Sequence, residues 1–433
     1  MPDDRTLTKD ALRGHLPVLD GLRGVAILLV LFFHFTDMTP ANAFDTALVT
    51  TIHWGHYGVD LFFVLSGFLI TGILVEARGK PGYFGSFYMR RVLRIFPLYY
   101  LLVIFSFLVL PNLGAALAGA PGVSPDTAQL VQGKLDRFGQ GGGDQWYYWL
   151  FASNFAVAKV DAYRHGILDV SWSLSIEEQF YLAWPLLLFF LGALRMRWVC
   201  LVILIVAPLF RAWLLERSVD PLFGGVPTLI DVYMYTPGRL EGIALGALLA
   251  IHLRAGHGRN SPEQRLRRLA PACKVLAPLL LVASLLVEWP HLTGTHTGPD
   301  PYLGGALFGI SFVAYGFAAL FVLALLAKKG TTWYRFWTWR PFVSFGKYSF
   351  AIYLLHLPVR AIIRDRAYGP NYNGDRFGDA LITFPRVLGS EFAGQLLFYA
   401  PALLACWCAG WLSWHCFEKH ALKLKRFFPY GKK

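Results

Sequence analysis

Charged side chains are scarce in this chain of 433 residues. Asp, Glu, Lys and Arg make up 15% of it, and hydrophobic residues make up 55%. A soluble domain carries about 25% charged residues. Long apolar runs recur along the whole chain, and they lack the apolar–polar alternation of an outer-membrane barrel. We therefore expect an all-α, polytopic integral membrane protein embedded in a lipid bilayer.

Acidic residues are the scarcer charged class, with 27 Asp and Glu against 40 Lys and Arg, which gives a formal net charge of +13. In a soluble protein this excess would suggest a nucleic-acid partner. Here the cations lie in loops between apolar runs, so orientation in the membrane explains them more simply. We expect no nucleic-acid partner.

Metal-binding motifs are also few. The five cysteines form no CxxC pair, so neither a zinc site nor a disulfide framework is predicted. The HxxH pair His53 and His56 has the spacing of two metal ligands, but no carboxylate stands at ligand spacing beside it. We expect these histidines to lie at the interface or to contact substrate, and we predict no metal.

About ten spans can be drawn, and loops 37–56 and 290–302 between them contain no Lys or Arg. The positive-inside rule then places both termini in the cytoplasm. Residues 1–433 are expected to form a single membrane domain, with a cytoplasmic segment at 1–16 and a basic cytoplasmic tail at 418–433. The predicted spans are 17–36, 57–76, 93–110, 172–192, 198–215, 229–252, 274–289, 303–327, 342–363 and 393–417.

The alternation of loops rich and poor in Lys and Arg leaves no place for an eleventh span. The aromatic stretch Trp146–Val157 would invert every later loop if it crossed the membrane. We therefore expect it to be interfacial or re-entrant.

The first span carries two ionisable residues, Arg23 and His34. Such groups cost several kcal/mol at membrane depth and are usually paired or functional. On a helix their spacing corresponds to about 1100° of rotation and about 16 Å of rise, so both lie on nearly the same face. Asp20, three residues before Arg23, is expected to pair with it. This line of polar groups suits a substrate path through the membrane.

Three arginines, Arg90, Arg91 and Arg94, introduce the third span. Guanidinium groups bind phosphates bidentately, so a cluster at the cytoplasmic mouth favours a polyanionic ligand. The alternative is a topology anchor that contacts lipid phosphates.

Carboxylates near the outer ends of spans are candidate partners for His34. Asp60 lies in the second span, and Glu177 opens the fourth on the same helical face as Tyr181 and Trp184. The alternative is that these carboxylates are merely interfacial.

Further polar groups lie in the later spans. Arg239 and Glu241 could simply neutralise each other, and His356 could be a packing residue.

At these residues the chain resembles the membrane acyltransferase-3 family, whose bacterial members acylate glycans and other acceptors. Arg23 and His34 fit the hallmark of that family, an Arg or Lys followed after ten residues by His. The matching segments occur in the family's order and are LDGLRGVAILLVLFFHF, GVDLFFVLSGFLI, FYMRRVLRIFPLYY, SWSLSIEEQFYLAW, RLEGIALGALLA and YSFAIYLLHLPV.

The resemblance implies an acyl-CoA donor from the cytoplasm, commonly acetyl-CoA, and an acceptor hydroxyl on a glycan or glycolipid. We expect His34 to be the general base, oriented and tuned by Glu177 or Asp60. The donor-binding residues are predicted to be Arg23, Arg91 and Arg94. The acceptor-binding residues are predicted to be Arg239, Glu241, His356 and Trp172. An acyl-His34 intermediate is the other route.

The function predicted from the sequence is O-acyl transfer, most simply O-acetyl transfer, to a cell-surface or exported glycan at the bacterial cytoplasmic (inner) membrane. Some family members carry a fused extracytoplasmic hydrolase-like domain, which this sequence does not contain, so we expect a stand-alone acylator. One alternative is O-acylation of a small secondary metabolite such as a macrolide. Another is a transporter of an anionic glycolipid. We predict no particular oligomeric state.

Overall fold

The computed structural model describes residues 12, 14–36, 38, 40–121, 124–125, 144–163, 166–255, 260–293, 304–367 and 387–431. Apart from an isolated β-bridge between Val387 and Ser390, the secondary-structure elements of these residues are helices. The first half contains α2 (Pro17–Phe35), α3 (Ala43–His53), η1 (Trp54–Tyr57), α4 (Gly58–Ala77), α5 (Tyr83–Ile104), η2 (Phe105–Val109), α6 (Leu110–Ala118), α8 (Gln145–Trp149), α9 (Ser153–Val160), η3 (Gly166–Leu168) and α10 (Ser171–Leu215).

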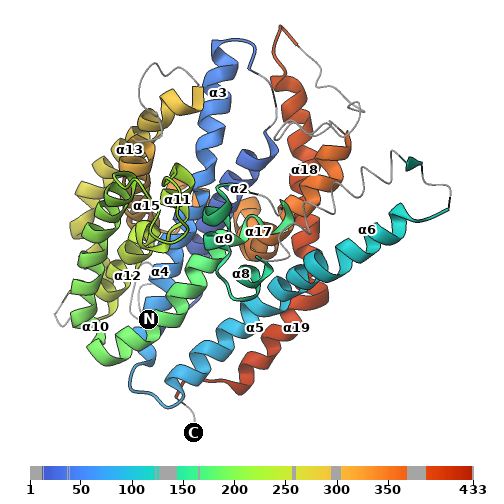
Figure 1. Cartoon of the computed structure of the whole chain (residues 1–433). Coiled ribbons are helices and arrows are strands. Elements are labelled where there is room, and N and C mark those ends of the chain that lie inside the picture. Colours follow the sequence, from blue (N-terminus) through green and yellow to red (C-terminus); the bar gives the residue numbers. More distant parts are fainter. Residues whose placement is uncertain are drawn as a thin grey trace.

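The second half begins with α11 (Leu229–Met234), η4 (Thr236–Arg239), α12 (Glu241–Arg254) and α13 (Pro262–Thr293). It continues with η5 (Gly305–Gly309), α15 (Ile310–Leu325), α16 (Thr332–Trp337), α17 (Arg340–Ala367), α18 (Phe392–Ser413), η6 (Trp414–Glu418), α19 (Lys419–Lys423) and η7 (Leu424–Phe427). Figure 1 shows α2, α4 and α17 in the middle, with α10, α12, α13 and α15 on one side and α5, α18 and α19 on the other.

The two most extensive helix pairings join α2 to α17 and α4 to α12. Small residues allow the first pair to approach closely. A Cβ atom on Gly24 would lie 1.9 Å from the carbonyl oxygen of Phe342, and one on Gly346 would lie 1.8 Å from that of Asp20. Helices in membranes pack tightly where small residues meet. These glycines therefore set the separation of the two helices that carry His34 and His356.

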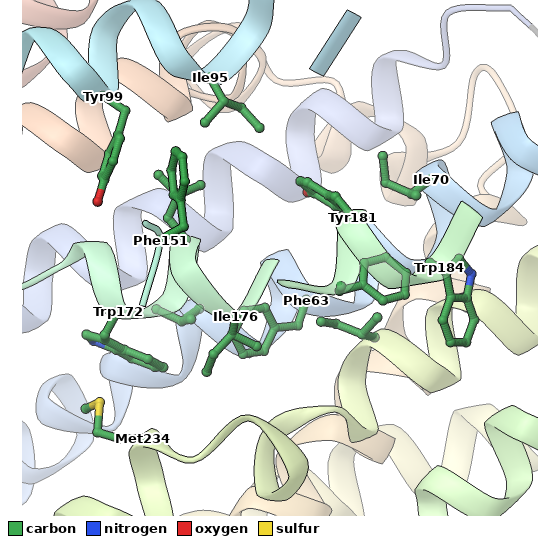
Figure 2. Packing of buried hydrophobic residues seen from close by; sticks show 14 of the residues in the cluster. Phe63, Ile70, Ile95, Tyr99, Phe151, Trp172, Ile176, Tyr181, Trp184 and Met234 are labelled. Carbon is green, nitrogen blue, oxygen red and sulfur yellow. The ribbon is translucent and has the colours of Figure 1, made fainter. Parts of the chain in front are cut away.

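Apolar side chains of α4, α5 and α10 form the largest buried cluster (Figure 2). Tyr181 and Trp184 of α10 belong to it together with Phe63 of α4. On α5, the Tyr99 ring stacks on Phe151 with centroids 4.3 Å apart. By contrast, α10 and α13 also expose large apolar side chains, including Phe190, Trp198, Ile205, Leu279 and Leu286, as expected of surfaces that face lipid.

Seven helical stretches of the described residues are long and apolar enough to cross a membrane. They are Pro17–Phe35, Ala43–Ala77, Tyr83–Ala116, Ser171–Leu215, Pro262–Trp289, Gly305–Leu325 and Phe392–Phe427. An all-helical, polytopic fold is therefore confirmed. The count of about ten spans and the cytoplasmic termini stay predictions.

The structure explains why seven helical stretches qualify as spans although about ten spans were predicted. The 45-residue α10 contains both predicted spans 172–192 and 198–215, and Gly192 interrupts it with φ 74° and ψ 163°. Only glycine adopts such a backbone conformation readily. The predicted span 229–252 is divided between α11, η4 and the 14-residue α12. The predicted span 342–363 falls within α17.

Two other predicted regions have defined structures. The stretch Trp146–Val157 forms parts of α8 and α9, which have 5 and 8 residues and are too short to span a bilayer. Within the region 418–433, predicted as a basic tail, residues 432–433 lie outside the described residues, and residues 419–427 form the short elements α19 and η7, which pack against α5. This part of the chain is therefore folded onto the helix bundle.

Candidate active site

Two imidazoles, His34 of α2 and His356 of α17, form the centre of the candidate site. His34 Nδ1 lies 3.3 Å from His356 Nε2, and the ring centroids are 4.7 Å apart. His34 Nδ1 also lies 2.9 Å from the carbonyl oxygen of Val30, and His356 Nδ1 lies 2.7 Å from that of Tyr353. His356 is fully buried, whereas His34 is partly accessible. The pair therefore joins a buried ring to one that a substrate can reach.

These hydrogen bonds determine which nitrogens carry protons. A carbonyl oxygen only accepts, so the proton of each neutral ring lies on Nδ1. His356 Nε2 is then an acceptor for the Nδ1–H of His34, which is shared with Val30. The lone pair of His34 is left on Nε2, which makes no hydrogen bond within the described residues. An imidazole in this tautomer is ready to accept a proton.

The surroundings of His34 are aromatic and cationic. The Phe33 ring lies 4.7 Å from His34 and 5.6 Å from His56 between centroids. The permanently charged group that acts most strongly on His34 is Arg360. A positive charge close to an imidazole favours its neutral form, the form that can act as a base.

Asp60 pairs with Arg239, and the Arg239 Nη2 atom donates a hydrogen bond of 3.0 Å to the Asp60 carboxylate. Both side chains are buried. The guanidinium lies 4.2 Å from the Tyr233 ring centroid and 5.7 Å from that of Trp172. Its Nε and Nη1 groups have no hydrogen-bond partner among the residues that the structure describes. Two unused donors on a buried cation are suited to binding an oxygen of a ligand.

Glu241 pairs with Arg211 instead of Arg239. Arg211 Nη1 donates a hydrogen bond of 2.5 Å to one carboxylate oxygen, and Ser311 donates one of 2.9 Å to the other. The Arg211 and Glu241 side chains are buried. The alternative that Arg239 and Glu241 neutralise each other is wrong, because each has a partner on another element. Both oxygens of Glu241 are used within the protein.

Glu177 of α10 lies beside Ser66, near the middle of α4, and makes no hydrogen bond with His34 among the described residues. Its carboxylate accepts hydrogen bonds of 2.7 Å from Ser66 and 2.8 Å from Tyr181. The contact with Tyr181 confirms that the two residues share a helical face. The positive charges of Arg91 and Arg23 act on this carboxylate. Among the described residues, the side chain that hydrogen-bonds to His34 is His356, and neither Glu177 nor Asp60 does so.

The predicted donor-binding arginines lie together at the other end of α2. Arg23 pairs with Asp20 at 3.1 Å, as the sequence predicted, and Arg94 lies 3.5 Å from the Glu418 carboxylate. Arg91 makes no hydrogen bond within the described part of the chain, and its charge acts on Arg94. Among the described residues, Arg23 and Arg94 thus each have a close carboxylate partner, whereas Arg91 has none within ion-pair distance.

The model of the acyltransferase domain that defines the acyltransferase-3 family matches residues 16–413. This range contains the histidine pair, the buried ion pairs and the three arginines. The chain belongs to the acyltransferase-3 family. The resemblance predicted from the motifs is thereby confirmed.

Relatives of this acyltransferase-3 chain have names that describe O-acetyltransferases. YrhL of Bacillus subtilis, named as a peptidoglycan O-acetyltransferase, is 30% identical over 352 residues, which cover 80% of this chain and 48% of YrhL. O-acetyltransferase OatA of Staphylococcus aureus is 25% identical, with coverage of 80% and 50%. Peptidoglycan O-acetyltransferase OatA of Listeria monocytogenes is 27% identical, with the same coverage. The chain spans about half the length of these curated relatives, and no solved structure matches it.

Four residues of this acyltransferase-3 site were missed from the sequence: Arg211, Arg360, Glu288 and Tyr57. Arg211 pairs with Glu241, and Arg360 acts on both imidazoles. Tyr57 donates a hydrogen bond to Glu288, whose other carboxylate oxygen lies 4.0 Å from His56 Nε2. Each of these polar residues lies within or beside an apolar run. That position was the sequence signal that could have identified them, because polar groups at membrane depth are usually paired or functional.

Replacing His356 with phenylalanine tests whether it positions the base. The substitution removes the acceptor for His34 Nδ1 and keeps a ring of similar size. We expect kcat to fall about 10- to 100-fold, the usual effect of losing a group that orients a functional histidine. The KM for the acyl donor should stay unchanged, and the pH dependence of kcat should shift.

His53→Phe is the matched control, because His53 also lies against Phe33 but does not hydrogen-bond to His34. The two variants should differ in steady-state kinetics at several pH values. Equal kcat values and equal pH profiles would contradict the positioning role.

Proposed function

We propose that this chain is a multi-pass membrane O-acetyltransferase that moves an acetyl group from cytoplasmic acetyl-CoA to a hydroxyl of a cell-surface glycan. The acceptor we favour is peptidoglycan, because two of the relatives are named for it. The observation that carries the proposal is the His34–His356 pair, with its free Nε2 lone pair. This position fits a general base that meets a hydroxyl.

The transfer needs no redox partner. The acceptor oxygen attacks the thioester carbonyl carbon while His34 Nε2 takes the hydroxyl proton. The C–S bond then breaks as the ester C–O bond is completed. The proton passes from His34 to the leaving thiolate, so the products are an acetyl ester and CoA thiol. Donor and acceptor are bound together in this scheme.

The charged groups have separate roles in this scheme. Arg23, Arg91 and Arg94 bind the phosphates of coenzyme A, because guanidinium groups form charge-assisted hydrogen bonds with phosphate oxygens. The unused N–H groups of Arg239 bind an oxygen of the acceptor or the oxyanion of the tetrahedral intermediate. Asp60 holds Arg239 in place. Glu177, between the two ends, orients Ser66 and Tyr181 along the path.

The activity is tested with purified full-length protein, acetyl-CoA labelled in the acetyl group, and soluble peptidoglycan fragments. We expect label in the fragments as a base-labile ester. Absence of transfer to any glycan acceptor, with intact acetyl-CoA recovered, would contradict the proposal. Mass spectrometry of surface glycans from a deletion strain should show the corresponding loss of O-acetyl groups.

The same label distinguishes the two routes. Without acceptor, the ternary-complex scheme predicts no covalent label on the protein. Label retained on His34 would establish the acyl-enzyme route instead.

A further inference from the structure

The C-terminal segment Lys419–Gly431 is anchored to the beginning of α5. Ser86 donates a hydrogen bond of 2.9 Å to the carbonyl oxygen of Pro429, and Arg90 Nη1 donates one of 3.2 Å to that of Phe428. The Arg90 guanidinium lies 5.4 Å from the Tyr430 ring centroid. Figure 1 shows α19, in red, alongside α5, in light blue. The segment is thus held against the helix that carries the arginine cluster.

This anchoring places Lys425 among cations. The charges of Arg91, Arg94 and Arg90 all act on its ammonium group. Lys425 is half-buried, whereas Lys423 in the same segment is exposed. Within the described residues, the Lys425 ammonium group makes neither a hydrogen bond nor an ion pair with a carboxylate. Its charge is therefore not balanced by the protein.

The charges near Lys425 do not cancel. Arg90 donates to a backbone carbonyl, and Arg94 has Glu418 as its ion-pair partner. Arg91 and Lys425 have no such partner in the described part of the chain. Like charges held close together repel each other. A bound polyanion would remove this repulsion, so the cluster of cations favours an anionic ligand.

We propose that Lys425 is a phosphate-binding residue of the donor site, delivered by the C-terminal segment to the same ligand as Arg91 and Arg94. This inference rests on the proposed function, since it takes coenzyme A as the source of the phosphate. The ammonium group acts as a point charge toward phosphate oxygens, next to the bidentate guanidinium groups. An anionic lipid headgroup offers the same chemistry and is the competing source.

The variant Lys425→Gln of the full-length protein in lipid nanodiscs tests this role, with Lys423→Gln as the matched control. CoA affinity is measured by isothermal titration. We expect Lys425→Gln to weaken CoA binding about 10- to 100-fold, the affinity that a hydrogen bond to a charged group contributes. The salt dependence of binding should also fall, because one charge of the site is lost. Lys423→Gln should bind as wild type does. Lys425→Arg, which keeps the charge, should retain most of the affinity.

Dephospho-CoA and anionic lipid separate the phosphate sources. A smaller loss with 3′-dephospho-CoA than with CoA would assign Lys425 to the 3′-phosphate, and an equal loss would assign it to the pyrophosphate. Equal CoA affinities of Lys425→Gln and wild type would overturn the inference. The inference would also be overturned if the substitution weakened thermal stabilisation by phosphatidylglycerol and left CoA binding unchanged. Wild-type protein that binds CoA but transfers no acetyl group would instead overturn the proposed function and leave the phosphate site standing.

Discussion

Replacing His34 with glutamine is expected to lower kcat by about 10²- to 10⁴-fold, the range that a positioned general base contributes. Glutamine keeps a polar side chain of similar length but cannot accept and return the hydroxyl proton. The KM for acetyl-CoA and the melting temperature should change little, because the arginines proposed to bind the CoA phosphates lie near the other end of α2. Steady-state transfer of labelled acetyl groups to a glycan fragment measures the effect.

A control substitution excludes a general effect of losing a histidine. His53→Gln removes an imidazole that lies 5.9 Å from Phe33 between centroids and makes no hydrogen bond with His34. It should retain most of the activity. Full activity of the His34 variant would remove the base from the mechanism and with it the whole catalytic scheme.

Breaking the buried pair of Arg211 and Glu241 is expected to have the largest effect on stability. Either Arg211→Met or Glu241→Met leaves one buried charge without its partner, which costs about 3–5 kcal/mol of unfolding free energy. The double variant replaces both charges with apolar groups and should unfold close to wild type. Unfolding of the four proteins in the same lipid or detergent measures the coupling.

The same set of variants decides the role of Glu241. The sequence predicted Glu241 to be an acceptor-binding residue, yet Arg211 and Ser311 occupy its two carboxylate oxygens. The double variant should therefore keep the wild-type KM for the acceptor. If its destabilisation equals the sum of the two single effects, Arg211 and Glu241 do not act as a pair.

Several local features were predicted from the sequence because they depend on spacing along one helix. Arg23 pairs with Asp20, and Glu177 shares a face with Tyr181. Both pairs are three or four residues apart, the spacing that brings side chains together on a helix. The six segments that carry the family resemblance also lie in helices, as predicted.

Contacts between helices could not be predicted in this way. His34 and His356 are 322 residues apart, and Asp60 and Arg239 are 179 apart. Helical periodicity indicates which face a residue lies on, but not which helix covers that face. The close approach of α2 and α17 at Gly24 and Gly346 decides that His34 meets an imidazole instead of a carboxylate. The position of Lys425 likewise depends on how the C-terminal segment folds back onto α5.

We propose that the acetyl group crosses from a cytoplasmic donor to an acceptor on the other side of the membrane, along the path between Arg23 and His34. Proteoliposomes test it when labelled acetyl-CoA is present on one side only and a membrane-impermeant glycan fragment on the other. We expect O-acetylated fragment from wild-type protein and at least about a 100-fold lower rate from His34→Gln. Product formed only when donor and acceptor share one compartment would contradict the account.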